Sequence, residues 1–330
     1  MTPMFKITAD SVDVTHLIRD RLLSLIAKDN AGIKSDSLEI KLDDANHEIE
    51  LPRTGASLDL FLGYAGAPLN FIGKYTVDEV EVFGPPSSML IRAKAADLTK
   101  SLKEPKTRTW QHAGKSPGRF KLKDILNTIA REHQLTPNVS AEFASLDYEV
   151  VNQTNEHDLN LLSRLAEKAG AVVKPANGYL LLVKKGEAKT VSGSLIPTIQ
   201  IEPKDVTNWR ASLVKRGAYG SVSARYRDLD IAEEVEVSTG DDAPTYQISK
   251  PVKDEAAAVK AANAQLDKFK RGESTLSLTM PGDTRLIAES VLSLSGFRTG
   301  ANGLWLAENV THSLTRAGFT TSVDGSAHFN

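Results

Sequence analysis

The clearest pattern of apolar and polar positions in the chain lies in residues 153–184. Apolar side chains there repeat at helical spacing, which predicts a helix with one buried face. They are Leu159, Leu161, Leu162, Leu165, Ala166 and Ala169. Gly170 follows the last of them and suits the left-handed conformation that ends many helices. Two short apolar runs then flank Asn177-Gly178, a pair typical of a type I′ turn, so the segment predicts a helix followed by a hairpin.

Polar residues predict where this helix starts. Asn155 is expected to cap it, with Glu156 and Asp158 in the first turn, where carboxylates face the positive end of the helix dipole. Upstream, a second helix is predicted from one apolar stripe, with Pro137 beyond its end. The stripe consists of Leu122, Ile125, Leu126, Ile129 and Ala130. Both helices and the hairpin together predict a small α/β module from about 119 to 186.

The first hundred residues have the alternation of β-strands. Apolar and polar residues alternate at 38–42, 58–62 and 89–93, and glycines and prolines separate these runs. In Lys74–Val82 the apolar positions change phase, which predicts a bulge. Residues 13–28 fit a helix or a strand, with the strand favoured. Short strands punctuated in this way are typical of a β-barrel or sandwich.

Two segments resemble connections rather than elements. Residues 103–120 are basic and contain several glycines and prolines, which predicts an exposed loop. Residues 186–203 are rich in Ser, Gly, Pro and Thr and predict a second linker.

The last part of the chain returns to strands, interrupted by one helix. Strands are predicted from about 209, and again at 275–280, 290–294, 303–314 and 319–323. Between them, the spacing predicts a helix over about 253–271 that Gly272 can end. Its expected buried face consists of Val259, Ala262, Leu266 and Phe269.

Length and composition bound the number of domains and the class of protein. At 330 residues the chain exceeds the ~250–300 residues that one core supports, so two or three domains are expected, and the pattern along the chain favours three. These are a β-barrel at 1–105, a connector with the α/β module at 106–186, and a second β-barrel with one helix at 187–330. A net charge of −2 disfavours sequence-independent DNA binding, and the absence of cysteine excludes disulfides and thiolate sites. Neither a signal peptide nor a membrane span is predicted.

No catalytic, cofactor or metal site is predicted. Gly114-Lys115-Ser116 lacks the upstream glycine of a phosphate-binding loop, since Thr109 stands there. The 7 histidines are dispersed without metal-ligand spacing. Adjacent carboxylates at Asp43-Asp44, Glu233-Glu234 and Asp241-Asp242 are expected in solvated turns.

Three stretches together resemble the phage late control protein D family, the baseplate hub proteins of contractile tails. The first contains Gln153, Glu156, Asp158, Arg164 and Gly170, with His157 where the family usually has Ser. The second contains Trp305, Val310, His312, Gly318 and Phe319. The third is N-terminal and contains Arg21, Leu22, Pro52, Gly55 and Gly84-Pro85-Pro86. The likeness covers most of the chain.

The resemblance implies a mainly β fold in which two tail-tube-type β-barrels flank a two-helix α/β module. It implies a homotrimer whose six barrels adapt a hexameric tail tube to a trimeric spike. Expected partners are the spike, the tube or tube-initiator protein and the tape measure protein, while DNA passes through the channel without specific binding. The expected location is the tail baseplate of the virion, assembled in the cytoplasm of a host bacterium.

The matched positions are expected to serve fold and packing rather than chemistry. They are Gln153, Asp158, Arg164, Gly170, Trp305, His312 and Gly318. Trp305 is expected to anchor a core or an interface between subunits, and His312 to be a satisfied hydrogen-bonding residue. Two alternatives stay open: a component that binds or degrades the cell wall, and a toxin-delivery spike. The second is disfavoured because no long β-helical needle follows the last hairpin.

Overall fold

A computed structural model describes residues 2–32, 35–47, 49–95, 102, 104–111, 120–176, 179–184, 198–213, 219–228, 231, 233–241, 243–271 and 274–327. The predicted turn at Asn177-Gly178, the Gly114-Lys115-Ser116 sequence and the helix end at Gly272 lie outside these residues. The chain forms two units that interleave along the sequence. The first unit comprises Met1–Asp97, Pro197–Ala211 and Leu276–Gly325, and the second Leu98–Ile196, Ser212–Thr275 and Ser326–Asn330.

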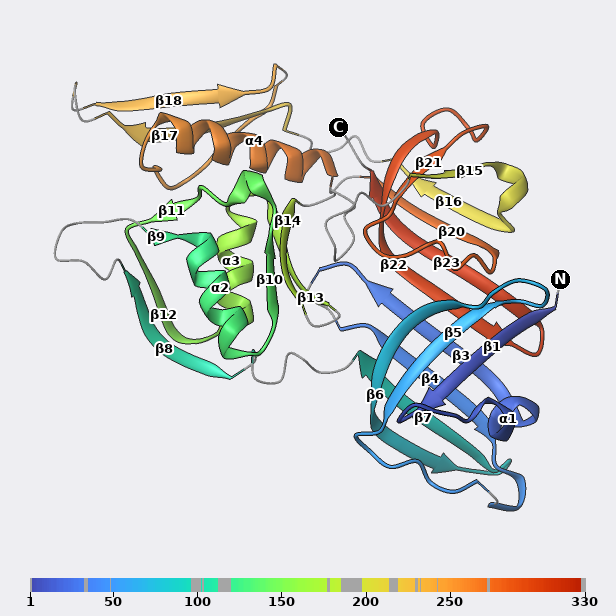
Figure 1. Ribbon diagram of the computed structural model, residues 1–330. Coiled ribbons are helices and arrows are strands. Elements are labelled where there is room, and N and C mark those ends of the chain that lie inside the picture. Colours follow the sequence, from blue (N-terminus) through green and yellow to red (C-terminus); the bar gives the residue numbers. More distant parts are fainter. Residues whose placement is uncertain are drawn as a thin grey trace. The chain divides into compact units, whose positions relative to one another are not determined.

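Strands from the beginning and the end of the chain share one sheet in the first unit (Figure 1). The N-terminal strands are β1 (Pro3–Ala9), β2 (Val12–Asp13), β3 (Leu22–Asn30), β4 (Ser37–Asp43), β5 (Ser57–Tyr64), β6 (Asn70–Phe83) and β7 (Ser88–Ala95). The C-terminal strands are β15 (Ile199–Ile201), β16 (Asn208–Ser212), β20 (Thr275–Pro281), β21 (Val291–Leu294), β22 (Gly303–Thr315) and β23 (Gly318–Ala327). The 13-stranded sheet has the order β16-β20-β23-β22-β3-β4-β7-β6-β5-β1-β2, and β15 and β21 branch off beside β22.

The junction between the two groups of strands is the antiparallel pair β22–β3. It runs in register from Asn309 opposite Asn30 to Thr315 opposite Ser24. Leu314 and Phe319 from the C-terminal strands are buried in the same core as the N-terminal strands. The alternating apolar residues at 38–42 and 58–62 form the buried faces of β4 and β5, as predicted. The predicted bulge is confirmed by a register shift between Val77 and Glu79 in β6.

The ambiguous segment 13–28 contains both kinds of element. A short helix α1 (Thr15–Ile18) and a 3-10 turn (Arg19–Arg21) precede β3. The Asp13 carboxylate accepts a hydrogen bond from the Thr15 backbone N–H at 2.9 Å, and the buried Thr15 hydroxyl accepts one from Ile7 at 2.9 Å. These side-chain contacts turn the chain before the strand begins.

The α/β module in the second unit contains both predicted helices, α2 (Leu122–Glu132) and α3 (Asp158–Glu167). Its strands are β8 (Pro105–Gln111), β9 (Phe120–Lys121), β10 (Thr136–Val139), β11 (Asp147–Tyr148), β12 (Val150–His157), β13 (Ala171–Ala176) and β14 (Tyr179–Lys184). Both predicted apolar stripes are buried in one core, apart from the partly buried Ala169, and β13 pairs with β14 as the predicted hairpin. Gly170 has φ +71°, the predicted helix-ending conformation.

Three predictions about connections and caps are wrong. Residues 105–111 are not a loop, because β8 pairs with β12 from His157 to Val150. Asn155 does not cap α3 and Glu156 is not in its first turn, because both belong to β12 and the helix starts at Asp158 after His157. A register shift after Gln153 leaves Asn155 with φ +46°. In the second predicted linker, 199–201 form β15, which pairs parallel to β21.

The rest of the second unit is a sheet covered by one helix. Strands β17 (Ser221–Arg227), β18 (Glu234–Thr239) and β19 (Thr245–Gln247) have the order β18-β17-β19, and α4 (Glu255–Arg271) packs against β17 and β18. The buried face of α4 holds Ala258, Ala262 and Leu266, whereas Val259, predicted to be buried, is 38% exposed. Ala258, Ala262 and Leu266 are four residues apart and therefore share one face of α4. Val259 follows Ala258 directly and points away from that face. No described helix is both long and apolar enough to cross a membrane.

Candidate functional site

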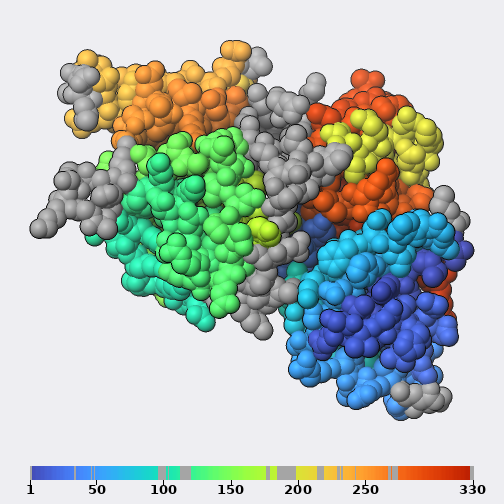
Figure 2. All heavy atoms as spheres, in the orientation of Figure 1, coloured from blue at the N-terminus to red at the C-terminus, as the bar shows by residue number. Residues whose placement is uncertain are grey.

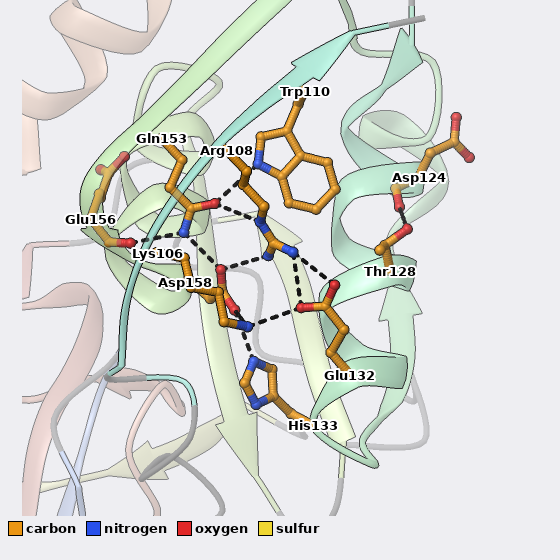
Figure 3. A network of polar contacts seen from close by, with 10 residues as sticks. All are labelled: Lys106, Arg108, Trp110, Asp124, Thr128, Glu132, His133, Gln153, Glu156 and Asp158. Carbon is orange, nitrogen blue, oxygen red and sulfur yellow. Dashed lines mark hydrogen bonds and ion pairs between the residues drawn. The ribbon is translucent and has the colours of Figure 1, made fainter. Parts of the chain in front are cut away.

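A network of charged and polar side chains lies where β8, β12, the end of α2 and the start of α3 meet (Figure 3). Its centre is Asp158, the first residue of α3, whose side chain is completely buried. Gln153 from β12 is also buried and donates to the Asp158 carboxylate at 2.7 Å. The structure therefore brings together two of the residues that the sequence singled out.

Both oxygens of Asp158 are fully bonded. Arg108 donates to Oδ1 at 2.7 Å and Lys106 to Oδ2 at 2.7 Å. The Nε2 atom of His133 lies 2.9 Å from Oδ2. A buried carboxylate is costly unless it is paired and hydrogen-bonded, and these contacts meet that requirement.

A second carboxylate closes the network. Glu132 lies 2.7 and 3.0 Å from Arg108 Nη1 and 3.0 Å from Lys106 Nζ. Arg108 also donates to Gln153 at 2.9 Å, and its guanidinium lies 4.1 Å from the centre of the Trp110 ring. Lys106, Arg108 and Trp110 alternate along β8, so their side chains share the face that meets the helices. The network thus ties β8 to α2 and α3.

The electrostatics of the network keep the carboxylates ionised. Burial raises the pKa of Asp158, but hydrogen bonds from Gln153, Lys106 and His133 and the charge of Arg108 outweigh it and lower the pKa to about 2. Burial likewise raises the pKa of Glu132, and its bonds to Arg108 and Lys106 lower it below the ordinary value. Neither group can act as a proton donor near neutral pH, which a general acid must do.

Glu132, His133 and Asp158 have ligand atoms within 4.8 Å of one another, a spacing that could hold a metal ion. The side chains around them do not fit that use. Lys106 lies between the two carboxylates, and Arg108 bridges them from the other side. A cation there would have to displace two positive charges, so the cluster is an ion-pair network.

Other matched positions of the module support its fold. Arg164 on α3 makes a paired contact with Glu156, at 3.0 Å from Nε and 2.7 Å from Nη2, and also donates to the carbonyl of Asn152 at 3.2 Å. It therefore fastens α3 to β12. This pair is partly exposed, so its contribution to stability is expected to be below about 1 kcal/mol.

The matched positions of β22 and β23 lie in the first unit. Trp305 is buried and donates from its indole N–H to the Ala301 carbonyl at 2.9 Å. His312 is 2% exposed, and its Nδ1 atom lies 2.9 Å from the Thr321 hydroxyl. Gly318 begins β23 with φ +140°, a conformation that favours glycine. The structure thus shows burial, hydrogen bonding or a glycine backbone conformation at each of these positions.

The pKa of His312 predicts a pH effect on stability. Burial lowers this pKa, although the charges of Asp29 and Asp283 and a backbone hydrogen bond to Leu286 oppose the effect. The unfolded chain therefore binds a proton at higher pH than the folded protein does. Stability is expected to fall as the pH drops below about 6.5, by at most ~1.4 kcal/mol per pH unit from this residue.

Urea unfolding at several values between pH 7.5 and pH 5.5 measures this slope. His312→Gln is expected to flatten it, and His16→Gln, which changes an exposed histidine, is expected to change it less. An unaltered slope in His312→Gln would contradict the assignment.

One of the carboxylate doublets is not a solvated turn. Asp44 is 4% exposed and accepts a hydrogen bond from the Ile49 backbone N–H at 3.3 Å. An oxygen of its carboxylate also lies 3.7 Å from Nδ1 of His47, and the two residues form an ion pair when His47 is protonated. The burial of Asp44 anchors the turn after β4. Glu233, Glu234 and Asp241 are exposed as predicted, although Glu234 begins strand β18 rather than lying in a turn, and Asp242 lies outside the described residues.

Comparisons with known proteins identify the family. The model of the phage tail baseplate hub (GPD) family matches residues 92–318. Over 98% of this chain, the probable baseplate hub protein of Escherichia phage 186 is 31% identical, with 92% of that protein covered. The probable baseplate hub protein of Escherichia phage P2 is 30% identical over 98% of this chain and 93% of its own length. The chain belongs to the phage tail baseplate hub family, and the resemblance seen in the sequence is confirmed.

A solved structure supports the fold independently. The 43 kDa tail protein of prophage MuSo2 from Shewanella oneidensis superimposes with a TM-score of 0.72 at 13% identity, covering 98% of both chains. At that identity the likeness concerns the fold alone. The predicted fold class, mainly β with an α/β module, is confirmed.

Proposed function

We propose that this baseplate hub protein forms a trimeric ring that adapts a hexameric tail tube to a trimeric spike. The observation that carries the proposal is the junction β22–β3, which joins two groups of strands from one chain into a single sheet. Residues 1–105 and 187–330 are then two tail-tube-type domains, and 106–186 are an inserted module. Three chains supply six such domains, which matches a hexameric neighbour, while the trimer itself matches the spike.

The partners follow from this arrangement. One face of the ring contacts the tube or tube-initiator protein, the other contacts the spike, and the tape measure protein ends near the ring. DNA crosses the central channel without specific contacts, which suits a chain of net charge −2. The location is the baseplate of the virion tail.

We also propose that the chain is not an enzyme. Its most concentrated group of titratable side chains among the described residues is the network around Asp158. There, hydrogen bonds and charges hold the pKa values of both carboxylates low, and their oxygens are already bonded to Lys106 and Arg108. Hydrolysis of wall glycans needs a protonated carboxyl group beside a second carboxylate, and this network offers none.

The mass of the purified chain in solution tests the proposal. Light scattering is expected to give three times the chain mass of 35.8 kDa, and class averages from negative-stain microscopy are expected to show a ring with a central hole. A monomer that stays monomeric when co-expressed with the spike would contradict the ring. Binding to purified peptidoglycan by that monomer would then favour the wall-binding alternative.

A further inference from the structure

A hollow of about 640 Å³ lies in the first unit, where the ends of several of its strands come together. The N-terminal strands β1, β3 and β5 and the C-terminal strands β20, β22 and β23 all contribute to its lining. The rings of Tyr64 on β5 and Phe319 on β23 are 5.7 Å apart, although other strands separate β5 from β23 in the sheet. The sheet therefore curves until its two groups of strands meet, and Figure 2 shows cyan atoms of the N-terminal strands directly against orange atoms of the C-terminal strands.

The walls of the hollow are mainly apolar. Four of the lining side chains also belong to the buried core of the unit, namely Phe5, Leu22, Leu314 and Phe319. Pro3, at the start of β1, and Pro281, at the end of β20, add further apolar surface. A ligand that displaces water from these walls gains most if it offers an apolar group.

Two arginines are the charged side chains among the residues that line the hollow. Arg19 lies in the 3-10 turn before β3, and Arg316 lies in the turn between β22 and β23. The second turn is fixed by a hydrogen bond of 3.2 Å from the Ala317 backbone N–H to the Thr315 hydroxyl. Both arginines are exposed, and neither forms an ion pair with a residue that the structure describes.

The acids that follow the lining residues in the sequence do not neutralise this charge. Asp283, two residues beyond Pro281, is paired with Arg285 at 2.6 Å. Asp20 follows Arg19 in the 3-10 turn, where successive side chains point about 120° apart, and it does not line the hollow. The described lining thus combines apolar walls with two cations that lack an acidic partner.

We propose that the hollow binds an acidic segment of another protein of the tail. One aromatic or aliphatic side chain of that segment enters between the apolar walls, and carboxylates beside it bind Arg19 and Arg316. The guanidinium group suits this use, because its fork of N–H donors matches the two oxygens of a carboxylate. This site goes beyond the ring proposed above and does not depend on it.

Charge complementarity and chemistry together favour a protein segment over DNA. The phosphates of DNA could pair with the arginines, but the backbone has no apolar group that fills the hollow. An extended peptide presents acidic and apolar side chains within a few residues of one another. The volume of the hollow also falls within the ~300–1,000 Å³ typical of ligand pockets, which is enough for an aromatic anchor.

Binding of short fluorescent peptides to the full chain, followed by fluorescence anisotropy, tests the site. The probe peptide has one phenylalanine between glutamates, and it is expected to bind the wild-type protein. Replacing its phenylalanine by serine, or its glutamates by lysines, is expected to weaken binding by ~10-fold or more, because each change removes one of the two complementary features.

Variants of the protein test the same two features. Arg19→Glu and Arg316→Glu are each expected to weaken binding of the probe peptide by ~10-fold or more and to strengthen binding of the lysine peptide. Arg298→Glu makes the same charge change at an exposed position outside the hollow, and this matched control is expected to bind like the wild type. Ala317→Trp keeps both arginines but fills the hollow from an exposed position, and it is expected to abolish binding. Circular dichroism checks that each variant is folded.

The outcomes separate this site from the ring. A wild-type protein that does not bind the probe peptide, or folded variants that all bind it as the wild type does, would overturn the inference. Tighter binding of a DNA duplex than of the peptide, lost in both arginine variants, would assign the arginines to DNA and also overturn it. A monomeric chain that binds the probe peptide through both arginines would contradict the ring and leave the site standing.

Discussion

Asp158→Asn is expected to lower the free energy of unfolding of the α/β module by about 3 kcal/mol or more. The substitution removes the buried charge that Arg108 and Lys106 share, and leaves them with Glu132 alone. Breaking a buried ion pair from one side costs roughly 3–5 kcal/mol, because the remaining charges lose their partner. The new amide group would also direct N–H donors at side chains that are themselves donors.

Urea denaturation followed by circular dichroism measures this loss. Asp124→Asn is the matched control, since Asp124 is an exposed acid on α2 whose carboxylate accepts, among the described residues, a 3.3 Å hydrogen bond from the Lys121 backbone N–H. It is expected to cost about 1 kcal/mol or less. An Asp158→Asn variant as stable as the control would show that the network contributes little.

Acid titration gives an independent readout of the same residue. The pKa of Asp158 is about 2 in the folded chain, against 3.8 for the free side chain. A lowered carboxyl pKa stabilises the fold above the unfolded value, and this contribution is lost as the pH falls from about 4 to about 2. The difference corresponds to ~2 kcal/mol, and Asp158→Asn is expected to remove that part of the acid transition.

Gly282→Ala is the second substitution with a large expected effect, about 3 kcal/mol of destabilisation. A Cβ atom at Gly282 would lie 2.0 Å from Cδ1 of Phe319. The Phe319 ring is 5% exposed and packs near Tyr64, at a centroid distance of 5.7 Å, so it has little room to move. The Gly282 N–H donates to the Phe319 carbonyl at 2.9 Å, which holds the two backbones together. Overpacking of this kind costs ~1–3 kcal/mol, and more where neighbours are fixed.

A double-mutant cycle identifies the cause of the loss. Phe319→Leu shortens the side chain that the new methyl group would strike, so it is expected to recover part of the stability of Gly282→Ala although it is destabilising by itself. Thermal unfolding of the four proteins measures the coupling. Strict additivity would mean that the clash with Phe319 is not the cause.

The three longer helices, α2, α3 and α4, and most strands were predictable because local periodicity determines them. The spacing of Leu122, Ile125 and Ile129 places them on one face of any helix that this segment forms. All three are buried in the core of the module, as that spacing predicts. The failures have a different origin. Residues 105–111 look like a loop by composition, yet Lys106, Arg108 and Trp110 alternate at strand spacing, a signal that the prolines and glycines around them obscured. Asn155 has the chemistry of a cap, but the pairing of β12 with β8 extends to His157 and delays the helix.

The partners of Asp158 could not be predicted by the same means. Lys106 and Asp158 are 52 residues apart, and His133 lies 25 residues before Asp158. The local sequence contains no signal that β8 and the end of α2 lie next to the start of α3. A buried carboxylate at the first position of an apolar helix requires a cation nearby. Which residue supplies that cation depends on the tertiary fold. Asp44 is a similar case, since its burial depends on the path of the turn after β4.

The pairing of β22 with β3 has a consequence for biosynthesis. The two strands are about 280 residues apart, so β3 leaves the ribosome long before residues 303–315 exist. Until then, the edge of β3 that later faces β22 has no partner from its own chain, although β4 can already pair on the other side. Contacts this distant in sequence slow folding, and an unpaired edge invites pairing with another nascent chain. Synthesis rate and chaperone protection are therefore expected to influence the yield of native hub protein more than the stability of either strand group does.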